Sequence, residues 1–143
     1  MRYLQDNLTQ KHFLLILAAV SLAFALPVIN SSNYYVDDLS RSLSGGLGWW
    51  PLGRPLSDIS ISSLSFSIKS SADIFPLTTL IAFVANMLTA YTLSNVFSLN
   101  KNVSTALICS LPVVNSLYLQ NMMYRYDCLP MSLSVLSAVY SLH

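Results

Sequence analysis

Four long runs of apolar residues, separated by polar segments, make up most of this chain of 143 residues. The runs cover about residues 13–29, 74–99, 103–123 and 129–143, and none of them contains Asp, Glu, Lys or Arg. A run of about 17 to 25 apolar residues is long enough to cross a bilayer as a helix, so the first three are predicted to be spanning helices. The segment 30–73 then forms a long polar loop between the first two spans.

The last run is too short to span, because about 14 residues cannot cross a hydrocarbon core of about 30 Å. A helix that stops inside a bilayer leaves backbone carbonyls without partners. We therefore expect the chain to be the truncated, N-terminal part of a longer protein, with an incomplete fourth span. The alternative is a short re-entrant or interfacial last helix.

Composition favours a membrane protein over a soluble one. The chain is 54% hydrophobic and 9% charged, with a mean hydropathy of +0.57, whereas soluble domains carry about 25% charged residues. A chain this short and apolar cannot cover itself with polar surface in water. The predicted fold class is an all-α integral membrane protein with about three to four spans. The net charge of +1 gives no electrostatic case for a nucleic-acid partner.

The first run also resembles a signal peptide, because Arg2 and Lys11 precede an apolar core. The small residues at cleavage-site spacing, Ala23 and Ala25, lie inside that core rather than after it. Because later runs are also of spanning length, we predict an uncleaved first span.

Basic residues in short segments indicate the orientation. Arg2 and Lys11 precede the first span, and Lys101 lies in the tight turn between the second and third runs. The N-terminus is therefore predicted to be cytoplasmic. The loop 30–73 and the polar segment 124–127 then share the outer side of the membrane.

The segment 59–68 alternates apolar and polar residues almost strictly, which is the pattern of a strand. A lone strand at a membrane surface would leave its edges without hydrogen-bond partners. Against the alternation, we therefore predict a helix that lies in the membrane interface.

Two adjacent carboxylates, Asp37 and Asp38, follow the first span. Adjacent carboxylates repel each other, so one of them is expected to have a raised pKa. A carboxylate with a raised pKa suits a general base near neutral pH, as an acceptor hydroxyl needs when it attacks an activated sugar. The alternative is a solvated loop, or a helix beginning at Leu39 that Asp38 caps.

Metal and cofactor sites are not predicted. Asp37 and Asp38 offer the oxygen ligands that hard cations prefer, but two carboxylates alone do not define a site, so a divalent-metal requirement stays open. Cys109 and Cys128 show no spacing typical of a metal site or a disulfide.

Five further residues are candidates for substrate binding: Arg41, Trp49, Arg54, Arg125 and Asp127. The arginines suit forked hydrogen bonds to a phosphate, or else snorkelling to lipid headgroups. Trp49 suits stacking on a sugar ring, or else the aromatic belt at the membrane interface. Arg125 and Asp127 either pair with each other or help to bind a phosphate and a sugar.

Several short motifs occur together in this chain. They are Tyr35–Arg41 (YVDDLSR), Gly48–Trp49, Gly53–Leu56 (GRPL) and Tyr124–Met131 (YRYDCLPM). In this combination they resemble the Gtr-type glucosyltransferases (the GtrII family) that modify bacterial O-antigen. The resemblance covers most of this chain but only about the N-terminal third of a typical member.

This resemblance implies a polytopic transferase of the GT-C type in the bacterial inner membrane. Such enzymes take a sugar from a polyprenyl-phosphate carrier and work on the periplasmic side. Members are commonly encoded by prophages and add glucose to the O-antigen of lipopolysaccharide, which changes the serotype.

By the same resemblance, Asp37 and Asp38 would supply the catalytic base, and Arg41, Arg54 and Arg125 would face the lipid phosphate. Later spans and an acceptor-binding domain are missing, so we expect this chain alone to be inactive. The rival hypothesis is a small non-enzymatic membrane protein, such as a flippase-like or assembly subunit.

Overall fold

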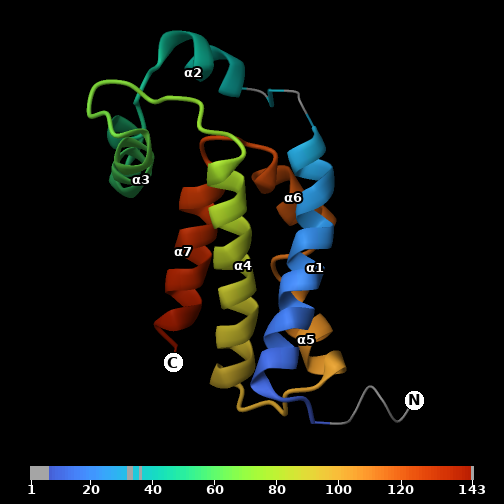
Figure 1. Cartoon of the computed structure of the whole chain (residues 1–143). Coiled ribbons are helices and arrows are strands. Elements are labelled where there is room, and N and C mark those ends of the chain that lie inside the picture. Colours follow the sequence, from blue (N-terminus) through green and yellow to red (C-terminus); the bar gives the residue numbers. More distant parts are fainter. Residues whose placement is uncertain (1–6, 32–33, 36, 143) are drawn as a thin grey trace.

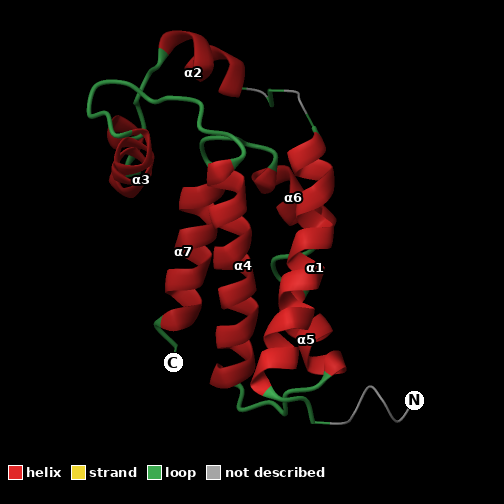
Figure 2. Cartoon of the chain, in the orientation of Figure 1, coloured by secondary structure: helices red, strands yellow, loops and turns green. Residues whose placement is uncertain are grey.

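The computed structural model describes residues 7–31, 34–35 and 37–142, and every regular element in these ranges is helical (Figures 1 and 2). The elements are α1 (Gln10–Asn30), α2 (Asp38–Ser44), the 3₁₀ helix η2 (Trp50–Leu52), α3 (Pro55–Ser65), α4 (Leu77–Val96), α5 (Val103–Ser110), α6 (Ser116–Met122) and α7 (Cys128–Tyr140). The predicted all-α class is therefore confirmed for the described part of the chain.

Helix α4 is the centre of the molecule, with α1, α5 and α7 packed around it (Figure 1). Its inward face is rich in small and hydroxylated residues, including Ala82, Ala90, Thr79 and Thr89. Small side chains let neighbouring backbones approach closely. In a lipid bilayer the hydrophobic effect does not drive helices together, so helices associate through such close packing.

Two helices are long and apolar enough to cross a membrane, by length and composition. Helix α1 has 21 residues and α4 has 20, and they match the runs predicted at 13–29 and 74–99. Helix α7 has 13 residues, too few to cross a hydrocarbon core of about 30 Å. The membrane-protein class is supported, while the total of three to four spans stays a prediction.

The run 103–123 is not the single spanning helix that we predicted. It forms α5 and α6, which are separated by a turn at residues 111–115. Pro112 lies in this turn, where its missing N–H and fixed φ oppose a continuing helix. Asn115 then starts α6, because its side chain accepts a hydrogen bond from the backbone N–H of Tyr118 at 2.9 Å.

The segment 59–68 is largely helical, as predicted against its alternating pattern. Helix α3 begins with Pro55 in its first turn, a position where the missing N–H costs nothing. Ile61 is fully buried, while Ile59 on the other side is 52% exposed. Ser60 and Ser65 donate their hydroxyls to carbonyls of their own helix at 2.7 Å, so serines in this helix do not need a strand partner.

The two polar segments of the chain lie at the same end of the helices, as the orientation argument predicted. Helices α2 and α3 sit where α1 ends and where α4 and α7 begin (Figure 1). The opposite end holds the turn around Lys101, whose carbonyl accepts a hydrogen bond from the N–H of Leu8 at 2.6 Å. Lys101 also donates to Ser94 and Asn95 at 2.5 Å, where a cation stabilises the carboxyl end of α4. Arg2 lies outside the described residues.

An exposed apolar surface covers η2 and the outer side of α3. Its exposed fractions are 65% for Trp50, 66% for Leu52, 73% for Leu56 and 52% for Ile59. Exposed apolar side chains in a loop between two helices of spanning length suit the membrane interface, where tryptophan is enriched.

The two tryptophans, Trp49 and Trp50, provide a test of this placement, because Trp49 is buried and Trp50 is exposed. The variant Trp49→Phe leaves Trp50 as the only fluorophore, and we expect brominated lipids to quench it strongly. The matched variant Trp50→Phe leaves Trp49, which should be quenched weakly and be shielded from aqueous acrylamide. Equal access of Trp50 and Trp49 to acrylamide, with no lipid quenching of Trp50, would contradict the interfacial placement.

Candidate active site

The aspartate pair lies at the start of α2, where the two carboxylates point into different environments. Asp37 precedes the helix and is exposed, and its side chain makes no capping hydrogen bond. Asp38 is the first residue of α2 and is fully buried. The helix ends at Gly45, whose φ of 62° closes the last turn in the left-handed conformation.

Asp38 holds the segment 124–127 rather than capping its own helix. Its Oδ2 accepts a hydrogen bond from the backbone N–H of Arg125 at 2.8 Å. Its Oδ1 is buried and accepts no hydrogen bond within the described residues. The alternative in which Asp38 caps a helix beginning at Leu39 is therefore wrong, because α2 begins one residue earlier and the Asp38 carboxylate binds a distant backbone.

The pKa of Asp38 is raised, as predicted for one member of the pair, but the physical cause differs. Burial raises the pKa of Asp38 most, and the negative charge of Asp127 adds to this, against the hydrogen bond from the backbone N–H of Arg125, which lowers it. Repulsion by Asp37 is not among the causes. Desolvation of the charged form, rather than an adjacent carboxylate, therefore sets the protonation of Asp38.

Arg125 pairs with Asp73, a residue that the sequence did not single out. Its Nη1 lies 3.0 Å from Oδ2 of Asp73, and the hydroxyl of Tyr34 donates to the same oxygen at 2.8 Å. The guanidinium also lies 4.2 Å from the ring centre of Tyr34 and 4.3 Å from that of Phe75, a cation–π arrangement. Arg125 thus joins the end of the long loop to the segment 124–127, and the alternative of an Arg125–Asp127 pair gives way to this one.

The same contacts set the charge state of Asp73. Partial burial raises its pKa, but hydrogen bonds from the backbone N–H of Phe75, from Tyr34 and from Arg125 outweigh burial and lower the pKa below its ordinary value. Asp73 is therefore ionised at neutral pH, and the ion pair with Arg125 persists there.

Trp49 is fully buried, so in this structure its ring is not open to a sugar, contrary to the stacking role that we predicted. Its ring packs with Ile61 and Tyr126. Its indole Nε1 donates to Oδ1 of Asp127 at 2.5 Å. The guanidinium carbon of Arg41 lies 4.0 Å from the centre of its ring.

Asp127 lies within reach of three charges of the outer loop, those of Asp37, Arg41 and Arg54. Burial raises the pKa of Asp127, the hydrogen bond from Trp49 and the positive charges of Arg41 and Arg54 lower it, and the negative charge of Asp37 raises it. The net direction is a raised pKa. Trp49 and Arg54 of the outer loop thus meet Asp127 at one place, although they lie more than 70 residues from it in the sequence.

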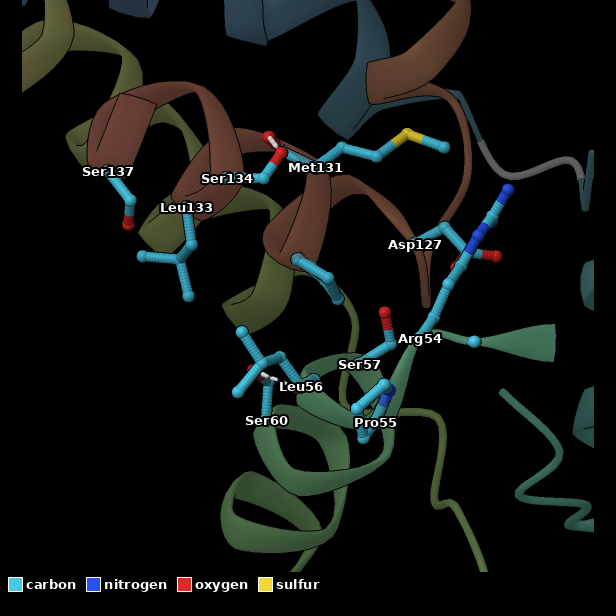
Figure 3. A pocket seen from close by; sticks show the side chains of 12 residues that line it. Arg54, Pro55, Leu56, Ser57, Ser60, Asp127, Met131, Leu133, Ser134 and Ser137 are labelled. Carbon is cyan, nitrogen blue, oxygen red and sulfur yellow. Dashed lines mark hydrogen bonds between the residues drawn. The ribbon is translucent and has the colours of Figure 1, made fainter. Parts of the chain in front are cut away.

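A cleft of about 760 Å³ opens between α3 and α7, with Arg54 and Asp127 together at one end (Figure 3). Away from this end the lining is mainly apolar and includes Leu56, Met131 and Leu133. The lining serines Ser60 and Ser134 donate to carbonyls of their own helices at 2.7 Å. With its mainly apolar lining, this part of the cleft is suited to an apolar ligand group.

The structure therefore gathers most of the predicted site residues but gives them different environments. Asp37 and Arg54 are exposed, Arg41 and Arg125 are half-buried, and Asp38, Trp49 and Asp127 are buried. Within the described residues, no three His, Cys, Asp or Glu side chains come together as a possible metal site. Two acidic residues were missed, and both act as supports: Asp73 pairs with Arg125, and Asp58 accepts backbone hydrogen bonds from Trp49 and Trp50.

Comparison with known proteins identifies this arrangement as part of a described family. The family model for the glucosyl transferase GtrII matches residues 26–142. A 55.3 kDa protein of Salmonella phage P22, encoded 5′ of gtrB and described as uncharacterized, is 30% identical over 135 residues. That match covers 94% of this chain and 28% of the phage protein. No solved structure matches the chain.

The opposite pKa shifts of Asp38 and Asp73 predict opposite pH dependences of stability. Because the pKa of Asp38 is raised above 3.8, its contribution to stability is fully present below that value and is lost as the pH rises through the raised pKa. We expect Asp38→Asn, whose amide oxygen still accepts the N–H of Arg125, to match or exceed the wild-type thermal midpoint at about pH 8.

The matched variant Asp73→Asn should behave in the opposite way. The contribution of Asp73 is present above 3.8 and is lost as the pH falls through its lowered pKa, so this variant should lose about 0.5–1 kcal/mol at about pH 7. Both midpoints would be followed in detergent micelles by tryptophan fluorescence. A larger loss for Asp38→Asn than for Asp73→Asn at about pH 8 would contradict this assignment.

Proposed function

Because the chain belongs to the GtrII family of glucosyl transferases, we propose that it forms the donor end of a membrane glucosyltransferase. The enzyme moves glucose from a polyprenyl-phosphate carrier to the O-antigen of lipopolysaccharide and thereby changes the serotype. The chain spans 28% of the length of its phage relative, and we assign the acceptor-binding part of this reaction to the rest of the whole protein.

We place the reaction on the periplasmic face of the bacterial inner membrane, with the N-terminus in the cytoplasm. Lys11 and Lys101 are described cations at the N-terminal end of the helix bundle, which favours a cytoplasmic position for that end. The candidate site lies at the opposite end (Figure 1). The GT-C arrangement of spans is part of the same proposal.

The cleft between α3 and α7 is the proposed donor site. A polyprenyl phosphate has an anionic head and a long apolar chain, and the cleft offers Arg54 at one end and apolar walls beyond it. A guanidinium binds phosphate oxygens through two parallel N–H bonds. Leu56 lines the cleft and its side chain is 73% exposed, which suits the interface from which a lipid enters.

Asp37 is the proposed general base. It is exposed, so an acceptor hydroxyl can approach it, whereas Asp38 is fully buried and positions the segment 124–127. In the proposed step, Asp37 takes the proton of the acceptor hydroxyl, and the hydroxyl oxygen bonds to the anomeric carbon of the sugar. The bond from that carbon to the phosphate oxygen breaks, and prenyl phosphate leaves with the electron pair, held by Arg54.

One observation carries this proposal: Arg54 and Asp127 lie together at one end of a cleft whose remaining lining is mainly apolar (Figure 3). Beside the cleft, buried Trp49 contacts two arginines and two carboxylates, namely Arg41, Arg54, Asp58 and Asp127. A lipid-phosphate sugar donor needs a cation for its phosphate next to an apolar cleft for its chain, and this end of the molecule offers both.

Lipid-phosphate binding is the direct test, and it uses the chain itself in lipid nanodiscs. Farnesyl phosphate titrated by calorimetry should bind, and farnesol should bind much more weakly because it lacks the phosphate. We expect Arg54→Gln to lower the affinity for farnesyl phosphate about ten-fold, since it removes a charge-assisted hydrogen bond to the phosphate. The control Lys69→Gln removes an exposed cation of the same loop outside the cleft and should change binding less than about two-fold.

Two contrary results of this binding experiment would have different meanings. No binding of farnesyl phosphate by the wild-type chain would overturn the donor-site proposal. Equal losses for Arg54→Gln and Lys69→Gln would assign the affinity to the general charge of the loop rather than to the cleft.

The two aspartates should differ in activity. In a protein extended to the length of the phage relative and supplied with lipid-linked glucose, Asp37→Asn should lower O-antigen glucosylation about a hundred-fold or more, because the base is lost. Asp38→Asn keeps an acceptor for the N–H of Arg125 and should lose less than about ten-fold. The reverse order of the two losses would make Asp38 the base and contradict the assignment.

A further inference from the structure

Trp49 contacts three charged residues of the candidate site through three different parts of its structure. Its ring supports the guanidinium of Arg41 at 4.0 Å, and its indole N–H donates to Oδ1 of Asp127 at 2.5 Å. Its backbone carbonyl accepts the N–H of Arg54 at 2.9 Å.

Trp49 is itself fixed from both sides. Its backbone N–H donates to Oδ1 of Asp58 at 3.3 Å, and its ring packs against Ile61 of α3 and against Tyr126. A fully buried aromatic side chain with its N–H satisfied has little freedom to move. The position of its indole N–H is therefore fixed by α3 and by the segment that leads into α7.

The hydrogen bond from Trp49 makes the two oxygens of the Asp127 carboxylate different, because the indole N–H binds only Oδ1. Oδ1 accepts the indole N–H of Trp49, which leaves Oδ2 as the carboxylate oxygen for a ligand. Asp127 lines the cleft beside Arg54 (Figure 3). A carboxylate held at one oxygen presents the other as an acceptor of fixed direction, which is the arrangement that recognises a sugar hydroxyl.

Resting on the proposed function, we propose that Trp49 is a positioning residue for sugar recognition, which holds Asp127 so that its second oxygen meets the donor's sugar beside the phosphate bound at Arg54. Trp49 does not touch the donor. It acts through Asp127 on the sugar, while its carbonyl keeps Arg54 in place for the phosphate.

If Trp49 acts on the sugar through Asp127, loss of the indole N–H should weaken the binding of a donor that carries the sugar and leave the binding of the sugar-free lipid phosphate unchanged. Phenylalanine at position 49 keeps an aromatic ring beneath Arg41 and keeps the carbonyl that binds Arg54, but it cannot donate to Asp127. In nanodiscs, Trp49→Phe should lower the affinity for farnesyl phosphoglucose about ten-fold, because a hydrogen bond to a charged group is lost. The affinity for sugar-free farnesyl phosphate should stay within about two-fold of the wild-type value.

Farnesyl phosphate also reports whether the variant is folded, because a general loss of structure would weaken both ligands together. Trp50→Phe is the matched control, since Trp50 is exposed and its side chain makes no contact to Asp127 among those described. That variant should keep the wild-type ratio of the two affinities.

A second comparison keeps the test decisive if Trp49→Phe weakens both ligands. In an Asp127→Ala background, Trp49→Phe should leave the affinity ratio of the two ligands unchanged, because Trp49 acts through a group that is already absent. An unchanged ratio in the single Trp49→Phe variant, or the same change of ratio in both backgrounds, would overturn the positioning role. Failure of the wild-type chain to bind either ligand would instead overturn the proposed function.

Discussion

Four consecutive residues, Tyr124 to Asp127, hold the described part of the outer loop against the helices. The backbone N–H of Arg125 binds Asp38 of α2, and its side chain binds Asp73 at the end of the loop. Tyr126 packs with Trp49 and Ile61, and Asp127 accepts the indole N–H of Trp49. The loop between α1 and α4 thus obtains its fixed shape from a short segment that directly precedes α7.

The contacts between the outer loop and the segment 124–127 depend on buried carboxylates, and burying a charged group costs free energy. Asp38 and Asp127 are 0% and 8% exposed, and the pKa of each is raised mainly because burial disfavours the ionised form. A buried carboxylate is tolerated when its hydrogen bonds are specific, and breaking one partner then leaves an uncompensated charge. The same cost makes the geometry rigid, and a rigid polar site is what orients a substrate without reorganisation.

The fold was predictable where hydrophobic length decides it, and less so where local chemistry interrupts it. The ends of α1 and α4 follow from the lengths of the apolar runs. The run 103–123 has the same apolar character, but Pro112 and the cap at Asn115 divide it into two short helices. Hydropathy averages over such residues, so the break was visible in the sequence only as a single proline.

The site was predictable as a set of residues but not as a set of roles. Adjacent residues such as Asp37 and Asp38, or Trp49 and Trp50, are equivalent in composition, and only the turn before α2 and the start of η2 expose one and bury the other. The partner of Arg125 is Asp73, 52 residues away in the sequence, and no local pattern indicates such a pairing. Long-range packing assigns these roles, so they appear only with the three-dimensional fold.

The cleft shows how the loop and the helices act as one unit. One wall is α3, which belongs to the outer loop, and the other is α7, which belongs to the helix bundle. Both walls meet at Arg54 and Asp127, so any movement of the loop relative to the bundle would separate the two charges. Trp49 bonds to both sides of this junction, through Asp127 on the α7 side and through Arg54 on the α3 side. The polar end of the cleft is therefore fixed while its apolar end stays open, which is the asymmetry that an amphipathic ligand requires.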